Sequence, residues 1–408
     1  MTWGYIVTLM QPDPSVAPVI KVAIVHEWLE HFAGSERVVE QLLLVFPQAE
    51  LFAIVDFMPA SERGMLAGRR VTTTFIQRLP FARKLFRNYI GLMPIAVEQL
   101  DLSGFDLIIS SNHAVAKGVI TGPDQIHVSY VHSPMRYAWD MQAAYLRQGG
   151  MERGLKGLFA RWLLHRLRNW DVRSASGVDM FVANSHYIRR RISKVYRREA
   201  AVVYPPVDIT RFQVTQGPRE AYVVVSRLVP YKRVDLVVEA FRRMPHRTLI
   251  VVGDGPERDR IAALASGAPN ITMRGKVPHD ALLALMQGAR AFVFAAEEDF
   301  GIAMVEAQAC GTPLIAFGRG GALDIVRGVG DAGGPTGLLF DCQTSDAIVD
   351  AVERFTVLAP LMTPELCRAN ALRFSEEAFR DSMRGLVEQV LSDNSRSART
   401  QPAARDGD

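Results

Sequence analysis

The sequence predicts an α/β protein whose two domains each contain a parallel β-sheet and face each other across a cleft. Three observations support this fold class. The chain has 408 residues, which fits two domains at roughly 100–200 residues each. Short apolar runs alternate with segments of helical periodicity, a pattern typical of parallel sheets covered by helices. Finally, a double proline, Pro205-Pro206, interrupts that alternation near the middle of the chain.

The first series of strands and helices predicts a domain over residues 20–204. It starts with an apolar run rich in β-branched residues at 21–25, which is typical of a buried strand. We expect a loop over 26–34 and, from the spacing of its apolar residues, a helix over 35–46. The later strands of this domain are expected at 51–55, 107–110, 127–131 and 178–183. Residues 1–19 contain three prolines and no periodicity, so we expect a loose leader there.

The second series predicts a domain over residues 205–375. It begins at the double proline because two consecutive prolines cannot continue a helix or a central strand. Its strands are expected at 221–226, 248–252, 271–273, 291–295 and 313–317. We expect a helix over 376–391, which could pack back on the first domain, and a disordered tail over 392–408. The chain would thus form two Rossmann-like halves. Ligands of such open sheets bind at the carboxyl ends of the strands, so we expect the site in the cleft.

Composition excludes several classes of protein. Hydrophobic residues make up 49% of the chain and charged residues 22%, which is too apolar for a disordered protein. The three cysteines are too few and too far apart for a disulfide framework or a cysteine-based zinc site, so we expect a reducing compartment. Apolar runs are far shorter than the roughly 18 residues of a spanning helix. The N-terminal region lacks the basic segment of a signal peptide.

Positive charge is concentrated in residues 151–198. This segment has 12 Lys and Arg residues against three acidic ones, whereas the net charge of the whole chain is only +4. Within it, apolar residues from Leu155 to Trp170 recur at helical spacing and are interleaved with basic ones. Such a helix can lie on anionic lipid, or it can turn its apolar stripe to the core and its basic face to water. Nucleic acid would also suit the charge, but no recognition motif accompanies it, so no nucleic-acid partner is expected.

The densest functional motif is the segment 298–306, Glu-Asp-Phe-Gly-Ile-Ala-Met-Val-Glu. Here a loop leaves an expected strand and enters a helix near Gly301, whose free backbone N–H groups would bind an anion. Glu306 could accept hydrogen bonds from a ribose, and Glu298 in the loop could face a sugar. Alternatively, the acidic residues lie near a helix start only because the helix dipole favours them there.

Two cations follow the strand that opens the second domain. In Ser226-Arg-Leu-Val-Pro-Tyr-Lys232, Arg227 and Lys232 would both extend from a strand end into the cleft. Two cations at one place suit a diphosphate. The alternative is a solvated loop whose charges are incidental.

Taken together, Arg227-x4-Lys232 and Glu298-x7-Glu306 resemble glycosyltransferase family 4, which has the GT-B architecture of two facing Rossmann-like domains. The resemblance covers nearly the whole second domain. Three further segments resemble the family's strands and loops, namely 309–315, Gly320-Gly321 and Gly253-Asp-Gly255-Pro256.

The first domain resembles the same family at two places. Ala33-Gly34-Ser35-Glu36 is similar to its glycine-rich loop, with Gly34 as the key position although Ala33 replaces the usual first glycine. His132 follows an expected strand, where the family places a histidine beside the donor sugar; a lone histidine is otherwise more often structural. Asp324 stands where the family often has Glu, which weakens any role for that position.

A subgroup of this family is similar at segments 25–28 and 130–140. It contains GDP-mannose-dependent mannosyltransferases of exopolysaccharide and O-antigen assembly. The resemblance therefore implies a retaining hexosyltransferase that moves an α-mannosyl group from GDP-mannose to a polyprenyl-diphosphate-linked oligosaccharide. Such a bacterial enzyme would be cytoplasmic and peripheral on the inner face of the cell membrane, with segment 151–198 against the lipid.

The resemblance also implies the site residues. Catalytic roles are implied for His132, Arg227, Lys232 and Glu298. Donor binding is implied for Gly34, Arg227, Lys232, Val277, Phe300, Gly301, Ile302, Ala303 and Glu306. The leaving phosphate would accept the acceptor proton, so no protein residue is assigned as general base. We expect no cofactor and no metal, because the two cations can neutralise the diphosphate and the one Asp-x-Asp motif is Asp406-Gly-Asp408 in the expected tail.

Other functions remain open from the sequence. One is a UDP-sugar-dependent glycosyltransferase of the same fold, and another is a membrane-surface sugar-nucleotide-binding protein without catalysis. A sugar-nucleotide epimerase would not explain the basic amphipathic helix. A dehydrogenase would need G-x-G-x-x-G, but Arg258 stands where the third glycine belongs.

Overall fold

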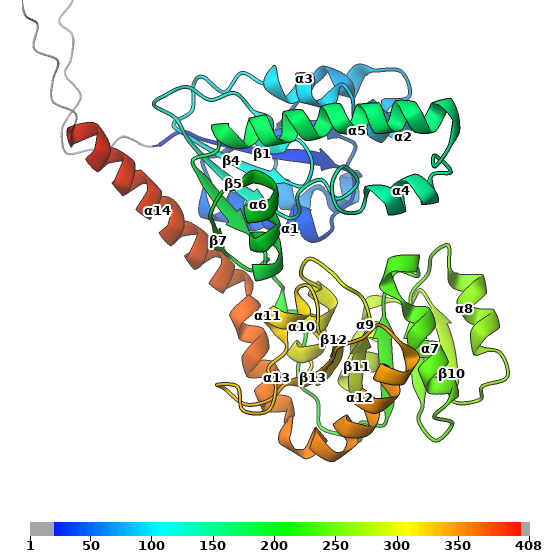
Figure 1. The fold of residues 1–408 in the computed structure, drawn as a ribbon. Coiled ribbons are helices and arrows are strands. Elements are labelled where there is room, and N and C mark those ends of the chain that lie inside the picture. The colour runs from blue at the N-terminus through cyan, green and yellow to red at the C-terminus, as the bar shows by residue number, and fades with distance from the viewer. Residues whose placement is uncertain (1–19, 401–408) are drawn as a thin grey trace, which may run out of the picture.

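The computed structural model describes residues 20–400 and contains two α/β domains with one parallel sheet each (Figure 1). Each strand expected from the sequence is present. The expected leader over 1–19 and the last part of the expected tail, 401–408, lie outside the described residues.

The first domain has a seven-stranded parallel sheet with the order β3-β2-β1-β4-β5-β6-β7. Its strands are β1 (Val22–Leu29), β2 (Glu50–Asp56), β3 (Val71–Thr73), β4 (Leu107–Asn112), β5 (Ile126–Val131), β6 (Met180–Ala183) and β7 (Ala200–Val202). Successive residues of β1 enter different cores, Ile24 on one face of the sheet and Val25 on the other. The α-helices of this domain are α1 (Gly34–Val45), α2 (Ala82–Leu85), α3 (Met93–Glu98), α4 (Gln142–Gln148), α5 (Gly154–Ser174) and α6 (His186–Tyr196).

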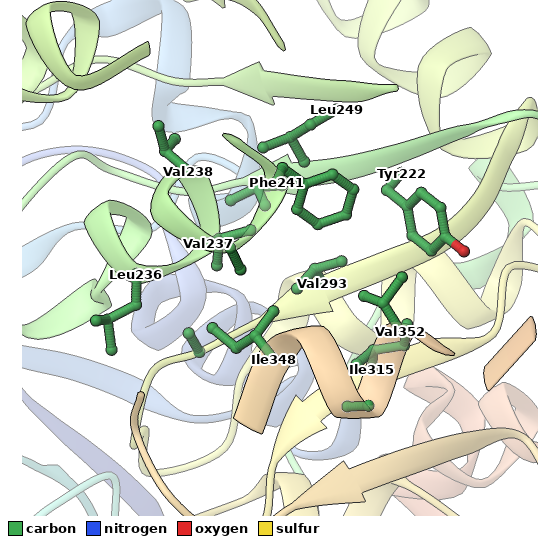
Figure 2. Close-up of a cluster of buried hydrophobic side chains, with 14 of the residues drawn as sticks. Tyr222, Leu236, Val237, Val238, Phe241, Leu249, Val293, Ile315, Ile348 and Val352 are labelled. Atoms are coloured by element: carbon green, nitrogen blue, oxygen red, sulfur yellow. The ribbon is translucent and has the colours of Figure 1, made fainter. Parts of the chain in front are cut away.

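The second domain has a six-stranded sheet with the order β10-β9-β8-β11-β12-β13. Its strands are β8 (Ala221–Val225), β9 (Leu249–Val252), β10 (Ile271–Gly275), β11 (Ala289–Phe294), β12 (Leu314–Phe317) and β13 (Gly337–Phe340). Its α-helices are α7 (Val234–Arg242), α8 (Arg258–Ala265), α9 (His279–Gln287), α10 (Ile302–Ala309), α11 (Ala322–Ile325), α12 (Ser345–Leu358) and α13 (Pro364–Ala371). On one face of the sheet, Tyr222 and Val293 from the strands pack with Phe241 of α7 and Val352 of α12 (Figure 2).

The last helix, α14 (Glu376–Thr400), returns from the second domain to the first (Figure 1). Phe379, Met383 and Val387 recur at helical spacing and are buried in the core of the first domain beside α1. The ring of Phe379 meets the ring of Tyr130 edge-on at 5.7 Å between centroids. The last helix therefore packs back on the first domain, as the sequence analysis allowed.

The chain crosses between the domains twice, and the two crossings touch. The first crossing lies at the predicted boundary, Pro205-Pro206, and the second precedes α14. The amide of Val207 donates to the carbonyl of Phe374 at 2.9 Å, and Val207 and Ser375 form a parallel β-bridge.

Two predictions about element ends were wrong. Strand β1 continues to Leu29, although a loop was expected from His26, because the polar side chains of His26 and Glu27 find partners inside the domain. The tail expected from residue 392 is helical as far as Thr400. Starting a helix is the unfavourable step, so a helix that packed residues have started can continue through polar residues. Strands β3, β7 and β13 were missed; each is short and lies at a sheet edge.

Between residues 20 and 400, no helix combines the length and the apolar character needed to cross a membrane. The long helix α5 is fixed to the domain through its C-terminal half. Asp171 on α5 and Lys117 form an ion pair at 2.7 Å with both side chains fully buried. The indole of Trp139 also donates to Asp171, at 2.8 Å.

Replacing Phe379 should test how much α14 contributes to the first domain. We expect Phe379→Ala to lower the free energy of unfolding by about 3 kcal/mol or more, since it removes a buried ring and leaves a cavity. Urea denaturation followed by circular dichroism measures the change. Val357→Ala, at a side chain that is 78% exposed, serves as the control. Equal midpoints for the two variants would mean that α14 is not part of the folded core.

Candidate active site

A cavity of about 910 Å³ lies between the two domains. Its walls come from loops at the carboxyl ends of strands in both sheets. The first domain contributes Gly34, Ser35, His113, His132, Arg136 and Asn184. The second domain contributes Ser226, Arg227, Lys232, Lys276, Val277 and the run from Glu298 to Ala303, among others. The cavity therefore occupies the place that two facing open sheets predict.

The loop between β11 and α10 forms one wall of this cavity. Gly301 caps α10 with a φ angle of 98°, a conformation that favours glycine. Helix α10 begins at Ile302, so its N-terminus lies at the cavity as predicted. A Cβ atom on Gly321 would lie 2.2 Å from the carbonyl oxygen of Phe300, and the amide of Gly321 donates to the carbonyl of Glu298 at 2.8 Å. Glycine there lets the loop after β12 pack directly beneath this wall.

Two predicted cations meet in the cavity. Lys232 lies in contact with the carboxylate of Glu298, and its side chain is 14% exposed. Burial lowers the pKa of Lys232 to about 8, with the charge of Arg136 acting in the same direction and that of Asp299 opposing it. Because a pKa of about 8 lies above neutral pH, the lysine stays largely protonated at pH 7. Arg227 lines the cavity and forms no ion pair with any residue in the described part of the chain.

A further group of charges, not predicted from the sequence, joins the domains. Asp299 of the second domain forms an ion pair with Arg136 of the first. Arg191 on α6 approaches the same carboxylate at 3.3 Å, and the hydroxyl of Ser185 donates to the Asp299 carbonyl at 2.6 Å. The loop that carries Glu298 is therefore held against the first domain. The sequence held two signals for these residues: Asp299 follows Glu298 directly, and Arg136 lies in the segment 130–140 that resembles the mannosyltransferase subgroup.

His132 lines the cavity from the end of β5, as predicted. Its Nε2 atom is 2.9 Å from the hydroxyl of Ser111. Burial, together with the neighbouring His113 and His26, lowers the pKa of His132 well below its usual value, so the imidazole is neutral. His113 also lines the cavity, and burial likewise lowers its pKa. Sequence reasoning missed His113, because it belongs to no motif and follows a strand that carried no other signal.

Two of the acidic positions lie elsewhere. Glu306 does not belong to the cavity wall; it is one turn further along α10, where burial raises its pKa and the charges of Arg37 and His279 oppose the rise. Asp324 accepts hydrogen bonds from the ring and the amide of His186, at 2.6 and 3.0 Å, and so adds to the contacts between the domains. Among the residues predicted to bind the donor, Glu306 is thus the one outside the cavity wall.

A second cavity of about 540 Å³ adjoins the first on the side of the first domain. It shares His113, His132, Arg136 and Asp299 with the larger cavity. Its remaining wall is mostly aromatic or apolar and includes Trp28, Met93, Tyr137 and Tyr145. The two cavities therefore meet at His132 and Arg136.

Comparison with protein families assigns both halves of the chain. Residues 32–211 match the model described as Glycosyltransferase Family 4, and residues 208–364 match the model described as Glycosyl transferases group 1. The two matches meet at the boundary between the domains and together span most of the chain.

Among curated proteins, the chain is 32% identical over 216 residues to a GDP-mannose-dependent α-(1-6)-phosphatidylinositol monomannoside mannosyltransferase of Mycobacterium tuberculosis, covering 45% of this chain and 54% of that protein. It is 27% identical over 266 residues to a D-inositol 3-phosphate glycosyltransferase of Acidothermus cellulolyticus, covering 57% of this chain and 58% of that one. The chain thus spans a little over half the length of these curated relatives.

Solved structures share the whole fold at low sequence identity. The Anabaena protein HepE in complex with UDP superposes with a TM-score of 0.64 at 16% identity, over 91% of this chain and 100% of that one. Sucrose-phosphate synthase from Thermosynechococcus elongatus superposes with a TM-score of 0.65 at 18% identity and the same coverage.

Two parallel-sheet domains that face each other with their strand ends at a common cavity define the GT-B architecture, as expected from the sequence. With both halves matched, the chain belongs to glycosyltransferase family 4.

Proposed function

We propose that this protein is a retaining hexosyltransferase that moves an α-mannosyl group from GDP-mannose to a polyprenyl-diphosphate-linked oligosaccharide in exopolysaccharide or O-antigen biosynthesis. The principal observation is one cavity that brings two cations and a helix N-terminus from the second domain opposite a neutral histidine from the first. Cations and free N–H groups suit a diphosphate, and a neutral imidazole suits a sugar hydroxyl.

Charge development during transfer explains the proposed roles. As the bond between the sugar and the diphosphate breaks, negative charge grows on the leaving phosphate. Fixed positive groups aimed at that charge stabilise the transition state. Arg227, Lys232 and the N-terminus of α10 would do this, and the residue contacting Lys232 in the free protein, Glu298, would turn to the sugar. The leaving phosphate would accept the acceptor proton, so neither a protein base nor a metal ion is part of the proposal.

GDP-mannose is proposed as donor because of the 32% identical mycobacterial relative, whose name specifies that donor. The second cavity is proposed to hold the end of the acceptor. It meets the donor cavity at His132 and Arg136, and the rings of Trp28, Tyr137 and Tyr145 in its wall offer apolar surface on which a sugar ring could pack. A UDP-sugar donor and a binding protein without catalysis are the alternatives that the assays below separate.

Helix α5 supports a lipid-linked acceptor. Its large apolar side chains before Leu163 are turned to solvent, with Leu155 86%, Leu158 66%, Phe159 61% and Trp162 55% exposed. The second half packs on the domain, where Leu167 is buried. The sequence also allowed the apolar residues of this helix to face the protein core, and they do so only in its second half. We propose that the first half lies on an anionic membrane, which would place the protein on the cytoplasmic face of that membrane.

Transfer assays test the donor and the cations together. Labelled GDP-mannose, UDP-glucose and UDP-galactose are each offered with a membrane lipid extract, and transfer is expected from GDP-mannose. Lys232→Ala should lose about 2–3 kcal/mol of transition-state stabilisation, which is roughly 30- to 150-fold in kcat/KM. Arg354→Ala, on the exposed side of α12, is the matched loss of a cation and should have no effect. Transfer from a UDP-sugar alone would overturn the mannosyl assignment, and near-normal turnover of Lys232→Ala would remove that residue from the site.

The pH dependence of the reaction should report on Lys232. The lysine must be protonated to hold a diphosphate, and its pKa is lowered to about 8. We therefore expect kcat/KM for the donor to fall as the pH rises above about 8. Lys232→Arg keeps its charge at higher pH and should shift the fall upward. The same high-pH limb in both proteins would show that another group causes it.

Vesicle binding tests the membrane surface. Sedimentation with vesicles of equal phosphatidylglycerol and phosphatidylcholine should recover the wild-type protein, and added salt should weaken the binding. Replacing both stacked rings, Phe159→Ser and Trp162→Ser, should reduce binding about tenfold or more because it removes apolar surface that would enter the interface. Val357→Ser, at an exposed position of the second domain, is the control. Equal binding of all three proteins would contradict the proposed surface.

A further inference from the structure

Four polar side chains form a chain from the loop at the start of α1 to the cavity. The Nε2 atom of His26 lies 3.5 Å from Oε1 of Glu36. The Nδ1 atom of His26 lies 3.0 Å from the hydroxyl oxygen of Ser111, which is in turn 2.9 Å from Nε2 of His132. His26 and Ser111 have no exposed surface, and Glu36 is 5% exposed. Of the four residues, His132 is the one at the cavity wall.

We propose that Glu36, His26 and Ser111 are positioning residues that fix His132 in the Nε2–H tautomer. Its Nδ1 atom then offers the cavity a hydrogen-bond acceptor for a hydroxyl group of the donor sugar. The hydrogen bond to the donor sugar rests on the proposed function, whereas the assignment of the tautomer does not.

The direction of the chain follows from Glu36. One of its oxygens, Oε2, accepts hydrogen bonds from the amide of Ala33 at 3.2 Å and from the hydroxyl of Ser35 at 2.9 Å. These bonds cap α1 and leave Oε1 facing His26. Burial favours protonation of Glu36, but His26, the backbone and Ser35 together lower its pKa, so it is ionised. The contact at 3.5 Å is longer than a hydrogen bond, but a carboxylate can only accept, so the nitrogen that faces it, Nε2 of His26, is the one to which we assign the hydrogen.

The remaining protons then have one arrangement. With its single N–H at Nε2, the His26 imidazole has a lone pair at Nδ1, which accepts a hydrogen bond from the hydroxyl of Ser111. The single O–H of Ser111 is already donated to His26, so its oxygen accepts a hydrogen bond from the N–H at Nε2 of His132. The lone pair of His132 is left on Nδ1, which bonds to no residue in the described part of the chain. The reverse arrangement would need a second N–H on His26, at Nδ1.

The same carboxylate thereby serves two parts of the site. One oxygen shapes the loop of Gly34, where an added Cβ atom would come within 2.9 Å of Ile302 at the start of α10. In the proposal, the other oxygen sets the proton on His132 through one close polar contact, with His26, and the two hydrogen bonds of Ser111. A substitution that keeps the cap but changes the charge of Glu36 separates these two effects.

Glu36→Gln is that substitution. Its amide oxygen can still cap α1, while its NH₂ group faces His26 and donates to Nε2. The chain then reverses, and Nδ1 of His132 becomes a donor. Ser111→Ala interrupts the chain without touching Glu36. Glu62→Gln is the matched control. Glu62 also accepts a hydrogen bond from a backbone amide in this loop, that of Phe32, and it also faces a histidine, His31. His31 does not belong to the chain that ends at His132.

The tautomer can be measured on the ligand-free protein by NMR of isotope-labelled histidine, with His132 assigned by loss of its signals in His132→Gln. We expect a protonated Nε2 and an unprotonated Nδ1 in the wild type and in Glu62→Gln, and the reverse in Glu36→Gln. A protonated Nδ1 of His132 in the wild type overturns the proposal even if no variant folds. An unchanged His132 spectrum in folded Glu36→Gln, as judged by circular dichroism, overturns it as well.

Activity supplies the second measurement. Glu36→Gln and Ser111→Ala should each lower kcat/KM for the nucleotide sugar about tenfold, as expected when a buried hydrogen bond to a substrate hydroxyl is lost. Affinity for GDP alone, which lacks the sugar, should stay within about twofold of wild type. Equal losses for GDP and for the sugar nucleotide would show that the cap, and not the tautomer, was disturbed, which overturns the proposal. Absence of transfer by the wild type would refute the proposed function and leave the tautomer result standing.

Discussion

The ion pairs of Asp299 are the interaction on which the arrangement of the site depends. Its neighbour Glu298, the start of α10 and the contact with Lys232 all belong to the second domain, whereas His132 belongs to the first. Arg136 and Arg191 hold the Asp299 carboxylate from across the cleft. A partly buried pair of this kind is costly to break on one side, because the remaining charge loses its partner. The two halves of the cavity therefore act as one site while these pairs are intact.

Much of the fold could be predicted because local patterns determine it. The apolar runs specified the central strands of both sheets, and the double proline marked the crossing between domains. Strands β3, β7 and β13 escaped because an edge strand of three or four residues has no periodicity to detect. The end of β1 escaped for a different reason. The sequence His26-Glu27 looks like a loop, and only long-range partners such as Ser111 make a buried strand of it.

The site was predictable where its residues follow one another in a motif. Arg227, Lys232, Glu298 and the residues at the start of α10 line the cavity as their spacing indicated. Residues brought in by tertiary packing were not predictable. His113 reaches the cavity because its loop is held by Glu27, whose carboxylate accepts the amides of residues 113–116. Glu306 shows the opposite case, since the motif includes it but the helix carries it away from the cavity wall.

The paired crossings between the domains restrict how this molecule can open. Two domains that are joined by a single crossing segment can rotate relative to each other about that segment. Here the segment at Val207 is hydrogen-bonded to the segment at Phe374, and α14 then fixes the second segment to the first domain. Movement of one domain relative to the other must therefore bend both crossing segments together, at the place where they are bonded. An opening of the cleft would have to separate Asp299 from Arg136 and Arg191 while the two crossing segments stay bonded to each other.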